Sequence, residues 1–95
     1  MNTRHMFEWD EQKNLQNQIS HNVSFEQACN AFNDPNHIII DDEWHSIDEP
    51  RYHIIGFDGV GVATVRFTMR EGIIRIFGAG YWRKGKKIYE RGNEE

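Results

Sequence analysis

The run V-R-F-T-M-R-E-G-I-I-R-I-F, residues 65–77, carries the pattern that decides the fold. Polar and apolar residues roughly alternate from Val60 to Phe77, and Glu71-Gly72 in the middle is a turn signal, which predicts two antiparallel strands. Successive side chains of a strand point to opposite sides, so every second residue shares a face. One face of the first strand then carries Thr64, Arg66, Thr68 and Arg70, and the other carries Val65, Phe67 and Met69. A sheet face with several guanidinium groups favours an anionic partner.

Two helices are predicted upstream of these strands. Asp10 is a good N-cap for a short amphipathic helix over 11–20, with Leu15 and Ile19 four residues apart on its apolar side. Ser24 begins a capping-box signature, and apolar residues at helical spacing follow it. The apolar face of this second helix carries Phe25, Ala28, Cys29 and Phe32.

The remaining segments are predicted to be strands, a loop and a tail. Residues 7–9 alternate as a short edge strand, 38–40 are β-branched, and 52–57 form a strand that ends in the hairpin signal Asp58-Gly59. Residues 83–91 are predicted to form a short basic helix or a frayed tail. The order predicts one α+β domain over 1–95, in which a four-stranded antiparallel sheet with a short N-terminal strand packs its helices on one face.

Composition supports a folded chain with an uneven charge. The 95 residues are enough for one domain, and 38% of them are hydrophobic, which excludes the composition of a disordered segment. The net charge is -4, but residues 1–50 carry two bases and ten acids (-8), whereas residues 51–95 carry nine bases and five acids (+4). The basic half can bind phosphate, and the acidic half can bind a basic partner.

Cysteine content and hydropathy indicate the compartment. Cys29 is the single cysteine, so no intrachain disulfide can form, and its apolar position in a helical pattern predicts a core residue in a reduced cytoplasm. No apolar run approaches the length of a membrane span, and the N-terminal residues lack the apolar region of a signal peptide. A cytoplasmic protein without a membrane partner is expected.

Short motifs along the chain occur in an ordered spacing. They are F-E-W-D at 7–10, Lys13, Asn17, H-x-V-S-F-E at 21–26, F-x-D-P at 32–35, H-S-x-x-E-x-R at 45–51, I-G at 55–56, T-x-R at 68–70 and I-R-I at 74–76. Together they resemble the BrnT family over about residues 7–90. The resemblance implies a RelE-like fold and a ribonuclease toxin of a type II toxin–antitoxin system. It also implies an arrest of translation or growth, and neutralisation by a BrnA-like ribbon-helix-helix antitoxin in a hetero-oligomer.

The chain departs from that family pattern at two places. The family continues from the last strand as I-S-A-R, whereas this chain reads Phe77-Gly78-Ala79-Gly80, so Gly80 stands where arginine is expected. Phe67 stands where some members have histidine. The first departure motivates an alternative function, a non-catalytic RNA- or protein-binding member of the same fold.

Cleavage of RNA without a metal needs a base for the 2′-hydroxyl, cations for the phosphate and an acid for the leaving oxygen. Arginine suits the phosphate because its planar fork binds two oxygens. His45 and Glu49, in the long loop 41–50, are the candidate acid and base. The predicted catalytic residues of this endoribonuclease are His45, Glu49, Arg51, Arg70 and Arg75. A structural alternative is that Glu49 pairs with an arginine and His45 caps the loop.

A second set of residues is predicted to contact RNA without reacting. These residues are Arg66, Thr68, Trp82, Arg83, Lys84, Lys86 and Lys87. Trp44 can also stack on a base. His21 is a weaker candidate for the acid or base of the active site, and it can instead interact with the end of its helix. A metal site would need Asp41, Asp42, Glu43, His45 and His53, but their spacing matches no known ligand pattern, so neither metal nor cofactor is expected.

Overall fold

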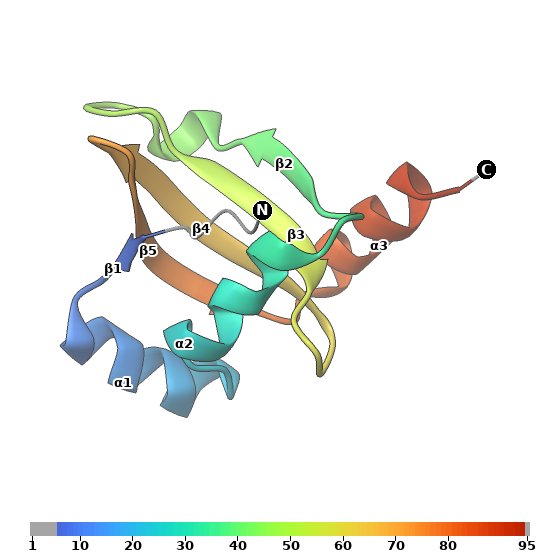
Figure 1. The fold of residues 1–95 in the computed structure, drawn as a ribbon, viewed down its shortest axis with the longest axis horizontal. Helices are drawn as coiled ribbons and strands as arrows, with labels where there is room; N and C mark the ends of the chain where they lie inside the picture. Colours follow the sequence, from blue (N-terminus) through green and yellow to red (C-terminus); the bar gives the residue numbers. More distant parts are fainter. Residues whose placement is uncertain (1–5, 95) are drawn as a thin grey trace.

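The computed structural model describes residues 6–94, which form a five-stranded sheet with helices on both faces (Figure 1). The strands are β1 (Phe7–Glu8), β2 (Ile38–Asp41), β3 (Tyr52–Phe57), β4 (Val62–Arg70) and β5 (Ile73–Gly80). The helices are α1 (Glu11–His21), α2 (Phe25–Ala28) and α3 (Arg83–Gly92), with short 3-10 helices η1 (Cys29–Asn33) and η2 (Glu43–His45). No helix in the described part of the chain has the length and apolar content to cross a membrane.

The sheet is mixed, with strand order β1-β5-β4-β3-β2. β2, β3, β4 and β5 are antiparallel to their neighbours, whereas β1 joins β5 in parallel, with Phe7 opposite Ile74. The α+β class is confirmed, but the prediction of a four-stranded antiparallel sheet is wrong. A two-residue strand is too short to carry a signal for its partner, and only the contacts of the folded chain place it on β5.

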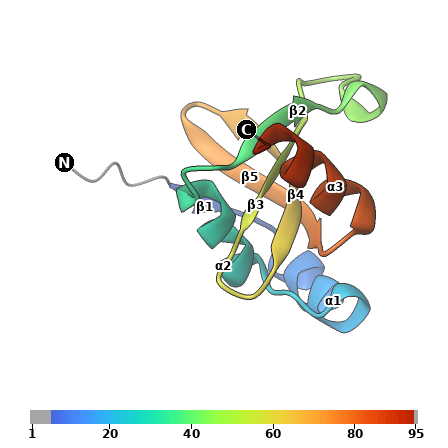
Figure 2. The same cartoon turned by 90° about the vertical axis from the view of Figure 1, so that its right-hand side faces the viewer.

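The helices lie on both faces of the sheet, so the prediction that they pack on one face is also wrong (Figure 2). α1 and α2 contact β5, and η1 contacts β3 and β4. α3 contacts β3 and β4 from the other side, where Gly85 lies against Thr64 and Ile55. Gly85 has no Cβ, and that allows the first turn of α3 to approach the strands closely.

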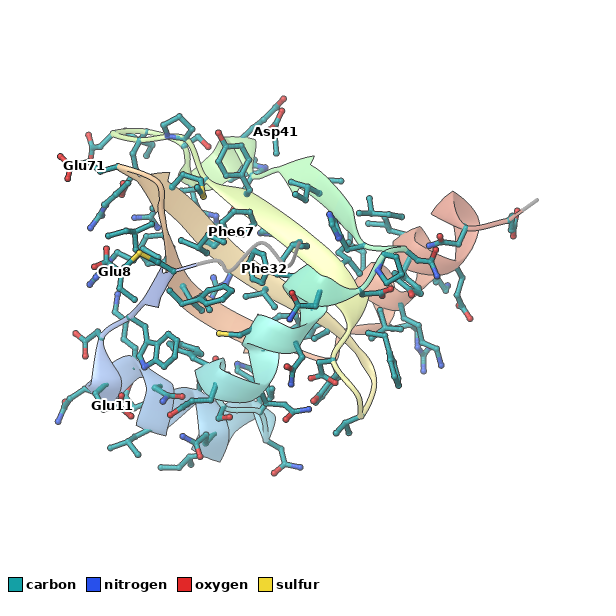
Figure 3. The ribbon with its side chains drawn as sticks, in the orientation of Figure 1. Glu8, Glu11, Phe32, Asp41, Phe67 and Glu71 are labelled. Atoms are coloured by element: carbon teal, nitrogen blue, oxygen red, sulfur yellow. The ribbon has the colours of Figure 1, made fainter. Side chains whose placement is uncertain are left out.

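The core lies between the sheet and the α2–η1 segment. Phe32 of η1 packs edge-on against Phe67 of β4, with ring centroids 5.1 Å apart (Figure 3). Phe25, Ile54 and Ile76 are at most 1% exposed on the same side. Val65 and Phe67 therefore face the core, and the alternation predicted for β4 is confirmed.

α1 does not bury the side that its apolar residues indicate. Leu15 is 55% exposed and Ile19 86% exposed, whereas Asn14 and Asn17 are buried. The Asn14 side chain accepts a hydrogen bond from the Phe25 backbone N–H and donates to Glu11 and Glu26. The helix is thus oriented by asparagine hydrogen bonds rather than by its aliphatic residues, which corrects the predicted apolar face.

The local signals for caps and turns are confirmed. The side chain of Asp10 accepts hydrogen bonds from two backbone N–H groups of the first turn of α1, and Ser24 caps α2. Glu71 and Gly72 have φ values of 52° and 81°, as a tight hairpin turn with two left-handed residues requires. The β4–β5 ladder contains a bulge at Phe77, because Gly78 pairs with Arg66 and Ile76 pairs with Phe67.

Candidate active site

The sheet face opposite the core has an end that α3 leaves open, and this end carries the predicted catalytic arginines. Register places Glu8 beside Arg75, and Arg75 beside Thr68 on the neighbouring strand. Arg51 precedes β3 and lies two residues before His53, which pairs with Arg66. The strands therefore align charged side chains across one surface.

Glu49 is the centre of an arginine cluster. Its two carboxylate oxygens accept hydrogen bonds from Nε and Nη2 of Arg70, at 2.9 and 2.7 Å, and Oε2 lies 3.8 Å from Nη2 of Arg51. The hydrogen bonds from Arg70 hold the pKa of Glu49 below its ordinary value, against a smaller opposing effect of burial. The charges of Arg70, Arg51 and Arg75 lower this pKa further. Glu49 is therefore an ionised carboxylate that orders the cluster.

Arg51 and Arg75 each have a second neighbour. The Arg51 guanidinium lies over the ring of Phe77, with 4.1 Å from Cζ to the ring centroid, and Lys13 of α1 approaches the same ring at 5.7 Å. Nη1 of Arg75 lies 3.6 Å from a carboxylate oxygen of Glu8. The β-bulge places the ring of Phe77 under the Arg51 guanidinium, so the bulge contributes to the position of Arg51 in the site.

Arg66 lies on the same face of the sheet and has no carboxylate partner among the described residues. Its guanidinium lies against the backbone of Gly78, because a Cβ at that position would be 3.0 Å from Nε and 3.1 Å from Cζ. Its buried Nε has no hydrogen-bond partner, and Arg66 makes no ion pair with any residue between 6 and 94. The buried Nε of Arg51 is also unpaired. The charge of Arg66 is therefore not neutralised by any described carboxylate, and that of Arg51 is met only by Glu49 at 3.8 Å.

Two histidines share the carboxylate of Asp42 next to the arginines. Nδ1 of His45 lies 2.8 Å from Oδ2 of Asp42, and Nε2 of His53 lies 3.1 Å from the same oxygen. Asp42 is only 8% exposed, and burial raises its pKa, but the hydrogen bonds and charges of the two histidines outweigh burial and lower it. A carboxylate at Nδ1 orients the imidazole, so Nε2 of His45 is left for proton transfer.

Backbone and hydroxyl contacts hold the 41–50 loop on the strands. Ser46 Oγ donates to the Asp42 carbonyl at 2.6 Å and accepts from the Arg51 N–H at 2.8 Å. Thr68 is 1% exposed, and its hydroxyl donates to the Pro50 carbonyl. Thr68 was predicted to contact RNA, but its buried hydroxyl anchors the loop instead.

The structure separates the predicted residues into two regions. One cluster contains Glu49, Arg51, Arg70 and Arg75. In the same loop as Glu49, His45 is hydrogen-bonded to Asp42. Trp82 and the basic residues of α3 are not part of that cluster, although Trp82 and Lys84 share a groove with Asp42 and His53. These basic residues, all exposed, are Arg83, Lys84, Lys86 and Lys87.

Sequence reasoning missed Glu8 and Phe77 as contributors to the site, and it considered Asp42 and His53 only as ligands of a metal site that it rejected. The alternation of the strands could have placed His53 on the face of Arg66. The bulge that exposes Phe77 to Arg51 has no comparable signal. No group of three or more His, Cys, Asp or Glu within residues 6–94 is arranged to hold a metal ion.

The open mixed sheet, its cationic face and the oriented histidine define a small α+β protein with a candidate anion-binding and proton-transfer site. The family model for the ribonuclease toxin BrnT of type II toxin–antitoxin systems matches residues 9–85, so the chain belongs to the BrnT family. The crystal structure of the Brucella abortus ribonuclease toxin BrnT is similar, with a TM-score of 0.63 and 18% identity. The match covers 81% of this chain and 95% of that chain, and at this identity it shows a shared fold. A comparison with curated proteins finds no match.

Proposed function

We propose that this chain is an endoribonuclease toxin that cleaves RNA at the open end of its sheet by metal-independent acid–base chemistry. The observation that carries the proposal is the convergence of three guanidinium groups on Glu49, beside a histidine that Asp42 orients. Membership of the BrnT family supplies the class of reaction.

The arginines bind the scissile phosphate in this proposal. Arg66 has no anionic partner within the described residues, and Nη2 of Arg51 is 3.8 Å from the Glu49 carboxylate. Both guanidinium groups can therefore donate hydrogen bonds to phosphate oxygens. Glu49 remains paired with Arg70, because both of its carboxylate oxygens accept hydrogen bonds from the Arg70 guanidinium. Guanidinium groups fixed before the substrate arrives stabilise the extra negative charge of the transition state.

His45 carries the proton in this mechanism. With Nδ1 on Asp42, Nε2 takes the proton of the 2′-hydroxyl, and the 2′-oxygen attacks phosphorus. The bond from phosphorus to the 5′-oxygen breaks, and that oxygen takes the proton that Nε2 of His45 has accepted, so His45 returns to its starting state. The products are a 2′,3′-cyclic phosphate and a 5′-hydroxyl. The lowered pKa of Glu49 makes it a weak base, which favours a positioning role for that carboxylate.

A second candidate function is binding of RNA or protein without cleavage. Gly80 motivates this alternative, because the family pattern places arginine there and Trp82 now lies against the glycine. Salt-dependent RNA binding with intact RNA recovered afterwards supports binding alone.

The proposal extends to the partner and the setting of the toxin. A BrnA-like ribbon-helix-helix antitoxin binds the chain as a hetero-oligomer in the cytoplasm, and release of the toxin stops growth by cutting RNA needed for translation. An acidic segment of the antitoxin suits the arginine cluster, and opposite charge speeds the association. We also propose kinship with the RelE-like fold.

Induction in cells and a digest of purified RNA test the proposal together. Wild type is expected to stop growth and cut RNA. His45→Ala and Arg75→Ala should lower the cleavage rate by about 10²- to 10⁴-fold, the range of a lost acid–base group or charge donor. Arg91→Ala, an exposed base at the far end of α3, is the matched control. Clean protein that leaves RNA intact and cells growing would refute catalysis.

A further inference from the structure

A groove of about 560 Å³ lies between the 41–45 segment and the first turn of α3. Trp44 and Trp82 line it, with Thr64 and His53 from the strands and Lys84 and Gly85 from α3. We propose that this groove binds one nucleotide of the RNA, with the base against the tryptophans and a phosphate at the first turn of α3. The inference rests on the proposed function and assigns a substrate subsite to it.

The two tryptophans are placed for contact with a base. Trp44 is 89% exposed, so its large apolar ring lies almost wholly in water. Trp82 is 38% exposed and is held against Gly80 on one side and edge-on to His21 on the other, with 5.1 Å between ring centroids. Indole rings that are exposed in a groove are platforms on which single-stranded bases stack.

The first turn of α3 is arranged for an anion. Trp82 is the N-cap residue and provides no side-chain hydrogen bond, and no acidic residue lies in the first turn. Arg83 and Lys84 occupy its first two positions. Free backbone N–H groups and the positive end of the helix dipole then act with two cations at the same place.

An unpaired buried hydroxyl gives a separate indication of a ligand. Thr64 is 6% exposed, lines the groove and lies against Gly85 of the same helix turn. Its Oγ1 has no hydrogen-bond partner within the described residues. A buried hydroxyl without a partner is unfavourable, and a phosphate oxygen near the helix end would satisfy it.

The opposite wall of the groove fixes the orientation of the nucleotide. Asp41, Asp42 and Glu43 line this wall, and Asp42 is paired with two histidines. The other two carboxylates are exposed and repel phosphate, so the phosphate lies at α3. The same carboxylates can accept hydrogen bonds from the amino groups of a base.

The groove is continuous with the proposed catalytic residues. His53 lines the groove, hydrogen-bonds to the Asp42 carboxylate that holds His45, and is opposite Arg66 in the ladder. A nucleotide in the groove is therefore next to the phosphate bound by the arginines. The subsite would hold a residue of the RNA that flanks the cleaved bond.

Binding of a 2′-O-methyl RNA tetranucleotide to the full chain tests the subsite, because this RNA has no 2′-hydroxyl and cannot be cut. Trp44→Ala should weaken binding by about tenfold, within the range for loss of one base stack. Thr64→Val keeps the side-chain shape and should weaken binding several-fold without lowering thermal stability, since it removes an unpaired buried hydroxyl. Ile47→Ala, in the same loop and 86% exposed before substitution, should bind as wild type.

The outcomes separate this inference from the proposed function. Wild-type affinity in both Trp44→Ala and Thr64→Val overturns the subsite, even if all-ribose RNA is still cut. Weakened binding in both variants supports the subsite, even if wild type fails to cut RNA and the proposed catalysis is wrong. Loss of antitoxin binding with unchanged RNA affinity also overturns it and assigns the groove to a protein.

Discussion

The indole of Trp82 lies against the backbone of Gly80, so close that a Cβ on Gly80 would be 2.7 Å from Cη2 and Cζ2 of the ring. This glycine thus makes room for an aromatic side chain two residues later. Because any larger residue at 80 would displace that ring, the two positions depend on each other.

Gly80→Ala is expected to lower the free energy of unfolding by about 1–3 kcal/mol, because the added methyl group overpacks against Trp82. Urea unfolding measures this loss, and near-UV circular dichroism reports the displaced indole. In a Trp82→Ala background Gly80→Ala should lower the free energy of unfolding much less, because the indole that obstructs the methyl group is absent. Equal losses in both backgrounds would contradict the dependence.

Asn17→Ala is expected to destabilise the protein by about 1–3 kcal/mol, because the buried asparagine joins α1 to β5. Its amide donates to the Val23 and Ala79 carbonyls at 2.9 Å each and accepts from the Ala79 N–H at 3.2 Å. Ile19→Ala on the same helix is the control and should change stability by less than about 0.5 kcal/mol. A larger effect at Ile19 than at Asn17 would mean that the helix packs by its aliphatic side.

Asp42→Asn is expected to lower the free energy of unfolding near neutral pH and to change it little at about pH 2. The folded pKa of Asp42 lies below its unfolded value, so its stabilising contribution is complete above the ordinary aspartate pKa of about 3.9 and disappears as pH falls through the folded pKa. Urea unfolding of wild type and Asp42→Asn from pH 2 to pH 7 should give free energies of unfolding that converge at the low end of this range. Asp48→Asn, exposed in the same loop, is the matched control.

Gly78→Ala is expected to weaken RNA binding while changing stability by less than about 1 kcal/mol. The new methyl group would meet the guanidinium of Arg66, which can move because it is the end of a flexible side chain. The salt dependence of RNA affinity should fall by about one unit of slope as a phosphate contact is lost. In an Arg66→Ala background, Gly78→Ala should have no further effect on affinity.

The thiol of Cys29 is expected to react slowly with iodoacetamide in the folded protein. Burial, followed by the negative charge of Glu26, raises its pKa to about 11, so its reactive thiolate is scarcer near pH 7.5 than in an ordinary thiol by about two orders of magnitude. Mass spectrometry of the labelled protein measures the rate. The same thiol in urea should react at the rate of a free cysteine, and fast labelling without urea would contradict the raised pKa.

Much of the fold follows from local sequence signals. Asp10 and Ser24 cap the helices that they were predicted to start, and Glu71-Gly72 makes the tight turn that joins β4 and β5. The alternation of β4 also placed Arg66 and Arg70 on one face. Helix capping, turn geometry and strand alternation act over a few residues, so sequence alone can show them.

Part of the candidate site could be predicted in the same way. The spacing of Glu49, Arg51 and the arginines of the hairpin, together with the family motifs, indicated residues that the strands do bring together. The pairing of His45 and His53 on Asp42 could not be predicted, because it joins a loop to a strand eleven residues further along.

By itself the sequence determined the strand and helix segments, their caps and turns, and the separation of acidic from basic residues along the chain. Tertiary structure alone decided that β1 joins β5, that α1 turns Asn14 and Asn17 inward, and that α3 lies opposite the other helices. The physical reason is the range of the interactions. Capping and alternation depend on neighbours in the chain, whereas the Asn17–Ala79 hydrogen bonds and the Gly85–Thr64 contact form only between segments that folding brings together.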